Sequence, residues 1–111
     1  STAMDYAVFC QMYLNGGIYG GKRILKKETV KLLTKPHTSK LYGPAEKIKR
    51  EHFYGYGWRV YRDGAFAHSG SDGTAAWVDP KNQLIVLVFT QSPSGSKLRD
   101  RFFKLVQLAI E

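Results

Sequence analysis

The chain has 111 residues, which is enough for one compact domain and too few for two. With 43% hydrophobic and 14% aromatic residues, its composition is typical of a globular protein and excludes a disordered one. The net charge is +8, no apolar run is long enough for a transmembrane helix, and the single cysteine, Cys10, excludes an internal disulfide.

The positive charge is concentrated in one segment. Ten of the 17 basic residues lie between Lys22 and Arg50, where the acidic residues are Glu28 and Glu46. Such a segment attracts nucleic acid, anionic lipid or an acidic cell-wall polymer, or is simply a solvated surface. Because the chain lacks the aromatic-plus-basic spacing of a single-strand binder, we expect no nucleic-acid partner.

The first 34 residues predict two helices. Residues 1–17 form an amphipathic helix that starts at a capping box of Thr2 and Asp5, ends at two glycines and buries Cys10 as an inert thiol. An extended connection then carries Ile24 and Leu25 inward. A shorter helix follows over about 27–34, and Pro36 prevents its continuation.

Residues 35–53 have no sustained period and predict a long basic loop, of the kind that is functional or mobile in a compact domain. Four strands then follow, over residues 55–62, 65–69, 73–79 and 84–91. The final helix, over about 97–110, has an apolar stripe of Leu98, Phe102, Leu105, Val106, Ala109 and Ile110. The predicted class is α+β, with an antiparallel sheet of three to four strands and an N-terminal and a C-terminal helix packed on it.

The run Leu84–Phe89 is apolar on both faces. Strands that face water on one side alternate, so this run predicts a central strand covered by helices on both sides. A chain this short has little material left to cover the sheet edges, and we therefore expect part of the fold to lie outside these residues.

The segment FAHSGSDGT, residues 66–74, concentrates polar side chains between two predicted strands. His68 and Ser69 are neighbours on a strand and point to opposite faces, so they do not form a nucleophile–base pair. Asp72-Gly73 is ordinary turn chemistry, and a plain strand end of small residues explains the segment without any function. The other histidines, His37 and His52, lack metal-ligand spacing.

The order of the segments STAMDYAVFCQMYLNGG, GGKRILKKETVKLLT, GYGWRVY, HSG and AWVDPKNQLIVLVFTQ, followed by a helix, resembles the C-terminal part of the serine β-lactamase-like family. That family includes class C β-lactamases, D-alanyl-D-alanine carboxypeptidases, D-aminopeptidases and related penicillin-binding-protein-like esterases. The resemblance implies part of the β-lactamase/transpeptidase-like fold and a serine hydrolase that acts through an acyl-enzyme. We expect no cofactor and no metal.

The resemblance also implies roles for His68-Ser69-Gly70, which matches the family's third motif with histidine in place of the usual lysine. His68 assists substrate binding and proton transfer, and Ser69 binds the substrate carboxylate or acyl side. Gly70 allows close approach of the substrate backbone. The backbone N–H of Ser71 is one of two oxyanion-hole donors.

The family's other two motifs, Ser-x-x-Lys and Tyr-x-Asn, have only false matches here. Ser94 to Lys97 follows the HSG strand, whereas the family's nucleophile precedes it, and this match is interpreted as a loop and helix N-cap. Tyr13 to Asn15 closes the first helix. We therefore expect this chain alone to be inactive.

We predict a single C-terminal fragment of a β-lactamase-like domain over residues 1–111: a helical segment (1–34), a basic loop (35–53) and a sheet with the last helix (54–111). Its expected partners are a β-lactam, D-Ala-D-Ala peptide or ester substrate and the missing N-terminal part of the same protein, with no membrane span. The family resemblance implies a periplasmic or secreted location. The rival hypotheses are a non-catalytic module that binds peptides or cell-wall fragments and, less favoured, a basic nucleic-acid-binding domain.

Overall fold

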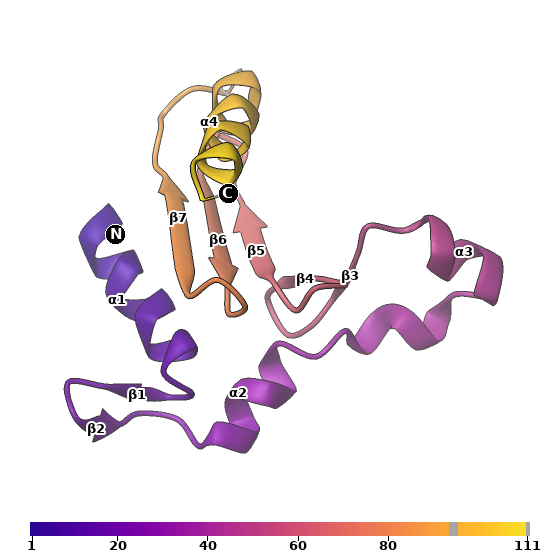
Figure 1. Cartoon of the computed structure of the whole chain (residues 1–111), viewed down its shortest axis with the longest axis horizontal. Helices are drawn as coiled ribbons and strands as arrows, with labels where there is room; N and C mark the ends of the chain where they lie inside the picture. The colour runs from indigo at the N-terminus through magenta and orange to yellow at the C-terminus, as the bar shows by residue number, and fades with distance from the viewer. Residues whose placement is uncertain (94–95, 111) are drawn as a thin grey trace.

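The computed structural model describes residues 1–93 and 96–110 (Figure 1). The helices are α1 (Ala3–Leu14), α2 (Lys27–Leu33), the 3-10 helix η1 (His37–Leu41), α3 (Pro44–Lys49) and α4 (Ser96–Ala109). The strands are β1 (Ile18–Tyr19), β2 (Lys22–Arg23), β3 (His52–Tyr54), β4 (Arg59–Tyr61), β5 (Phe66–Ser69), β6 (Ala75–Asp79) and β7 (Leu84–Val88).

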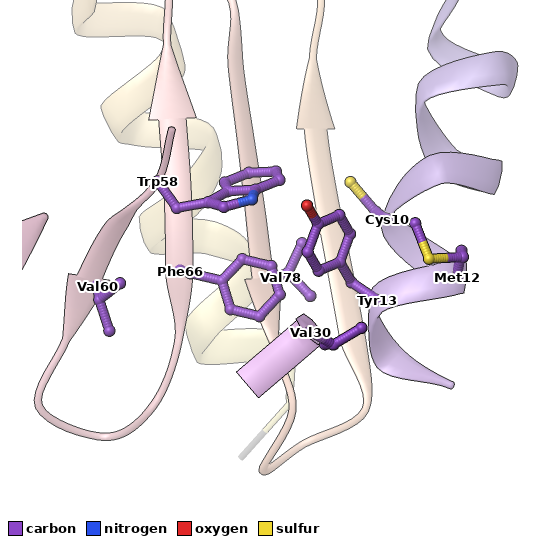
Figure 2. Packing of buried hydrophobic residues seen from close by; sticks show 8 residues of the cluster. All are labelled: Cys10, Met12, Tyr13, Val30, Trp58, Val60, Phe66 and Val78. Atoms are coloured by element: carbon purple, nitrogen blue, oxygen red, sulfur yellow. The ribbon is translucent and has the colours of Figure 1, made fainter. Parts of the chain in front are cut away.

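The fold is built around one antiparallel sheet of five strands in the order β3-β4-β5-β6-β7. The helices α1 and α4 both contact β7. Figure 2, seen from the side of α1, shows α4 behind the strands, so the two helices cover opposite faces of the sheet. This arrangement confirms the predicted α+β class, with five strands in place of three to four.

The core lies between α1 and the sheet, and aromatic rings dominate it (Figure 2). The ring of Tyr13 meets those of Trp58 and Phe66 with centroids 5.5 and 5.6 Å apart. Cys10 on α1 and Val78 on β6 are completely buried beside them. This cluster fixes the position of α1 against the strands β4 to β7, and thereby one wall of the region where β5 ends.

The segment predicted as a loop is partly ordered into secondary structure. Residues 35–53 contain η1, α3 and the start of β3, which form the arm that extends from the sheet in Figure 1. The guanidinium of Arg62 holds this arm, because it donates to the carbonyls of Lys47, Ile48 (2.8 Å) and Arg50 (3.2 Å). These elements were missed because each is too short to set up a hydrophobic period.

Two packing predictions were wrong. The strand β7 is covered on both faces by helices, as its apolar sequence indicates, but it lies last in the described sheet and is not central. Ile24, predicted to point inward, is 58% exposed. The connection that carries it folds into the β1–β2 hairpin, whose turn projects from the core.

The apolar stripe predicted for the last helix also lies mostly in the open. Leu98 and Leu105 are 63% and 56% exposed. The helix meets the sheet through a neighbouring face, where the ring of Phe103 lies 6.2 Å from that of Trp77. Amphipathic spacing therefore identified the helix correctly, but the stripe that it indicated is not the one that contacts the sheet.

Candidate active site

The predicted motif lies where β5 ends and turns into β6. Strand β5 pairs with β6 from Phe66 to Ser69, but it pairs with β4 only at Phe66 and Ala67. β5 is therefore an inner strand over its first half, and a free edge only from His68 onward. Continuing the register would place Gly57 opposite Ser69, but the chain leaves the sheet there, with a φ of 81° at Gly57.

The side chains of His68 and Ser69 lie on opposite faces of the sheet. His68 shares the α1 face with Phe66, while Ser69 lies on the α4 face, where its Oγ accepts a hydrogen bond of 3.1 Å from the guanidinium of Arg59. A guanidinium carries only donors and does not take up a proton. The partner of Ser69 is therefore no general base, and the motif does not form a catalytic pair by itself.

The turn after β5 is held in place from two sides. The Gly70 N–H donates to the Thr74 carbonyl (2.9 Å), which closes the hairpin. On the other side, the Asp72 carbonyl accepts from the Thr90 hydroxyl (2.6 Å) and the Ser92 N–H (2.9 Å). The Asp72-Gly73 pair does form the predicted turn, and Gly73 adopts a φ of 86°.

Gly70 is required by close contact. A Cβ at this position would lie 2.4 Å from Thr74 Oγ1, closer than real Cβ contacts come. The absent side chain also leaves the backbone accessible beside Ser69 and Ser71. The structure thus explains why a glycine follows Ser69.

The backbone N–H of Ser69 points toward the free edge. Because the Gly70 N–H points toward β6, the N–H of Ser69, the last residue of β5, points to the opposite side, where β4 does not reach. Among residues 1–93 and 96–110, no backbone acceptor is recorded for the Ser71 N–H. The edge therefore offers polar backbone groups of the kind that pair with an added strand.

A hollow of about 850 Å³ opens beside this edge. It is lined by backbone or side-chain atoms of all the predicted site residues, His68, Ser69, Gly70 and Ser71, together with Tyr6 from α1 and Phe89 after β7. The rings of Tyr6 and Phe89 meet at 5.9 Å and form an aromatic part of its wall. No sequence pattern pointed to these two residues, because only the tertiary fold brings them to the motif.

The raised pKa values of Tyr6 and Cys10 indicate that both groups are partly shielded from water. Burial, reinforced by Cys10 and Tyr13, raises the pKa of Tyr6, so its phenol keeps its proton. Burial also raises the pKa of Cys10 to about 11, which confirms the interpretation of an inert thiol. Neither group is a nucleophile at neutral pH.

No described residue of the two false motif matches, Tyr13 to Asn15 and Ser94 to Lys97, lines the hollow. Tyr13 is a buried core residue, and Asn15 is the C-cap of α1, as predicted. Ser94 and Gly95 of the Ser-x-x-Lys match lie outside the described residues. His37 stacks on Tyr56 far along the chain from the hollow, and within the described part of the chain no three His, Cys, Asp or Glu residues form a metal-binding group.

The comparison with protein families matches the family model described as Beta-lactamase over residues 1–109. The chain belongs to the beta-lactamase family. The resemblance that the sequence segments predicted is thereby confirmed, and it covers α1 as well as the sheet.

Relatives within and near the beta-lactamase family carry several names. The chain is 30% identical over 106 residues, 84% of its length, to an Escherichia coli (strain K12) protein named "Putative D-alanyl-D-alanine carboxypeptidase". Among solved structures, it is similar to a "Putative 6-aminohexanoate-dimer hydrolase from Bacillus anthracis", with a TM-score of 0.74, 27% identity and 99% of this chain covered. A beta-lactamase-like structure from Bacteroides dorei, at 21% identity and a TM-score of 0.62 over 94% of this chain, supports the fold alone.

The chain matches only a part of each of these proteins. It covers 22% of the Escherichia coli protein, 28% of the Bacillus anthracis chain and 39% of the Bacteroides dorei chain. No helix within the described ranges is long and apolar enough to span a membrane.

Proposed function

We propose that this chain is the C-terminal, substrate-binding portion of a penicillin-binding-protein-like serine hydrolase. The observation that carries the proposal is the free edge from Ser69 to Ser71, which lies beside a hollow, with the Ser69 N–H directed outward and no backbone acceptor recorded for the Ser71 N–H among the described residues. A peptide-like substrate adds to such an edge as an extra strand, held by main-chain hydrogen bonds. The substrate is a β-lactam, a peptide ending in D-Ala-D-Ala, or an ester.

In the complete enzyme, a serine outside these residues attacks the substrate carbonyl and forms an acyl-enzyme. The carbonyl oxygen becomes negatively charged, and the Ser71 N–H is one of the two donors that stabilise it. One such donor lowers the barrier by about 3–4 kcal/mol. His68, on the hollow side of β5, assists substrate binding and proton transfer, while Ser69 binds an acceptor group of the substrate.

The partner that completes the site is the remainder of the same protein. Two features of the described residues support this: the apolar stripe of α4, with Leu98 and Leu105 exposed, and the outer edge of β7, which has no neighbouring strand in the described sheet. Both features are suited to being covered by further elements.

The proposal predicts that the isolated chain turns over neither nitrocefin nor p-nitrophenyl esters, because Ser69 has an arginine as its partner and no base. The measurement is absorbance at saturating substrate, with the buffer rate as the blank. Robust turnover that disappears in the Ser94→Ala variant would contradict the assignment of the nucleophile to another part of the protein.

The free edge itself is tested by NMR on the ¹⁵N-labelled chain. Titration with N-acetyl-D-alanyl-D-alanine is expected to shift the amide signals of Ser69, which points outward, and of Ser71, for which the described residues record no backbone acceptor. The amides of Phe66 and Gly70, which point to β6, serve as internal controls and move little. Shifts confined to residues away from β5 would refute strand addition.

A second candidate function is a non-catalytic module that binds peptides or cell-wall fragments through the same edge. It is favoured by the fixed turn at Asp72, which holds the edge in shape without any nucleophile. An experiment on the parent protein distinguishes the two functions. Labelling of a Ser-x-x-Lys serine by a fluorescent penicillin would support the hydrolase. A parent protein that is not labelled but still binds the peptide would support the binding module.

A further inference from the structure

The arm that contains η1 and α3 exposes two large aliphatic side chains. Leu41, the last residue of η1, is 72% exposed, and Ile48 on α3 is 75% exposed. A single exposed aliphatic residue is ordinary at a protein surface. Here, however, neither of the two helices, both fully described, contributes a buried residue. The aliphatic side chains of the arm therefore serve no core of this chain and face outward.

Lysines flank both aliphatic side chains along the sequence. Lys40 precedes Leu41, and Lys47 and Lys49 stand on either side of Ile48. All three lysines are exposed. Each helix of the arm thus presents an aliphatic group and ammonium groups next to each other.

The positive charge of the arm is not neutralised by ion pairs. Over residues 35–53, the arm has five basic and two acidic side chains, which gives a net charge of +3 with histidine neutral. The ion pair recorded among residues 1–93 and 96–110 joins Arg99 to Asp100 on α4, so the lysines of the arm form none there. Such unpaired surface charges attract anionic partners over distances of about 10 Å at 0.1 M salt.

Hydrogen bonds to the sheet hold the arm in a fixed shape. The Arg62 guanidinium donates to three carbonyls at the C-terminal end of α3, among them that of Ile48 at 2.8 Å. At η1, the Thr38 hydroxyl accepts from the Tyr54 N–H of β3 at 2.9 Å. The backbone thus keeps the aliphatic side chains and the lysines on the outside of the molecule.

The arm lies away from the features assigned to the remainder of the protein. It leads into β3, at one end of the sheet order, whereas β7 with its outer edge lies at the other end. Figure 1 shows α3 at the far end of the arm, away from β7 and α4. The described residues that line the hollow beside β5 include none from the arm. A partner that covers the arm would therefore leave the hollow and the edge of β7 accessible.

The combination of exposed aliphatic groups and lysines distinguishes between the possible anionic partners. Charge alone attracts nucleic acid, an acidic polymer and an anionic lipid surface alike. Of these three, the lipid surface also takes up aliphatic side chains, because entry into the boundary between headgroups and acyl chains removes them from water. A lysine beside such a group keeps its ammonium at the headgroups while its methylene stem lies against apolar surface.

We propose that the arm is a docking surface for an anionic lipid bilayer. Leu41 and Ile48 enter the boundary between headgroups and acyl chains. Lys40, Lys47 and Lys49 bind the acidic headgroups. This inference goes beyond the proposed hydrolase function and does not depend on it, since the arm and the hollow share no described residue.

The experiment is co-sedimentation of the 111-residue chain with vesicles of phosphatidylcholine that contain about 30% phosphatidylglycerol, compared with vesicles of phosphatidylcholine alone. Binding is expected to the anionic vesicles only, and to weaken as salt rises from about 0.1 to about 0.5 M. The double variant Lys47→Gln, Lys49→Gln should bind about tenfold to thirtyfold more weakly, because each lysine near an anionic surface contributes about fivefold. The double variant Leu41→Ser, Ile48→Ser should lose at least about tenfold.

The matched control is the double variant Lys104→Gln, Leu105→Ser, which removes an exposed lysine and an exposed leucine from α4. It is expected to bind the anionic vesicles as the native chain does. Circular dichroism of all three variants checks that they are folded. All the substituted side chains are exposed, so native-like spectra are expected.

Several results would overturn the docking surface. Equal binding to both kinds of vesicle, or binding to neither, would exclude an anionic bilayer as the partner. Binding that depends on the lysines and is unchanged in Leu41→Ser, Ile48→Ser would indicate a surface that reads charge alone, as expected for nucleic acid or an acidic polymer. A loss in the α4 control without a loss in the arm variants would assign vesicle binding to α4.

The same comparison on the parent protein tests whether the remainder of that protein covers the arm. Binding with the same losses in the arm variants would support the proposal. A parent protein that does not bind the anionic vesicles, while the 111-residue chain does, would show that the remainder covers the arm and would refute it.

Discussion

The two faces of the five-stranded sheet differ in how completely they are covered. On the α1 face, Cys10 and Val78 have no exposed surface and the aromatic rings interlock. On the α4 face, Trp77 contacts Phe103, but its buried indole N–H lacks a hydrogen-bond partner among the described residues. The helix α1 is thus packed firmly against the strands, while α4 rests on the sheet by a narrower contact.

The largest expected effect comes from comparing one large-to-small substitution on each face. Phe66→Ala on the α1 face should lower the free energy of unfolding by about 3–5 kcal/mol, because it opens a cavity among packed rings. Leu105→Ala on the outward side of α4 should change it by less than about 0.5 kcal/mol. Urea unfolding followed by circular dichroism measures both, and similar losses for the two variants would show that α4 is covered as well as α1.

A smaller effect on the free energy of unfolding is expected at Gly70, which directly follows β5. Gly70→Ala should cost about 1–3 kcal/mol, because the new Cβ would overlap Thr74 Oγ1 at 2.4 Å. Removing that hydroxyl in the Thr74→Ala background should reduce the penalty of Gly70→Ala to below about 1 kcal/mol. A penalty unchanged in the double variant would mean that Gly70 is required for another reason than this contact.

The smallest effect is a pH dependence of the free energy of unfolding, which reports on the burial of Cys10 on the α1 face. An unfolded thiol titrates near 9.0, while burial raises the pKa of folded Cys10 to about 11. The stabilisation from keeping this thiol neutral is full below pH 9 and is lost as the pH rises toward 11, because only the unfolded chain releases the proton in that range. The free energy of unfolding should therefore fall more steeply over pH 9 to 10.5 in the native chain than in Cys10→Ala.

Parallel pH profiles for the native chain and Cys10→Ala would contradict the burial of a neutral thiol. Thiol labelling gives an independent measure on the same samples. Iodoacetamide should modify Cys10 slowly in the folded chain and rapidly in urea.

The longer elements could be predicted from the sequence because each carries a sustained local pattern. The helix α1 starts with the predicted hydrogen bond from the Asp5 N–H to Thr2 Oγ, at 3.1 Å, and ends at the predicted Asn15. The arm of η1 and α3 was missed because residues far along the chain hold it. Arg62 donates to the Ile48 carbonyl of α3, and the Tyr54 N–H donates to the Thr38 hydroxyl of η1 at 2.9 Å. Contacts over such sequence distances leave no periodic signal.

The geometry of the candidate site was predictable at its centre and not at its margins. The alternation of a strand predicts that His68 and Ser69 face apart, and the small residues mark the accessible backbone. Arg59 and Tyr6 could not be assigned to the site, because the strand register brings one there and the packing of α1 the other. The free edge also depends on where β4 starts, which Gly57 decides through its backbone conformation.

The two hydrogen bonds on the Asp72 carbonyl bear on the entropy of binding. They tie the tip of the β5–β6 hairpin to the segment after β7, so its residues are ordered before any ligand arrives. Fixing a free backbone costs about 1–2 kcal/mol per residue, and a ligand that met a disordered tip would lose that amount from its affinity at Gly70, Ser71 and Asp72. In the proposed strand addition, the hydrogen bonds from Thr90 and Ser92 therefore raise the affinity without contacting the added strand.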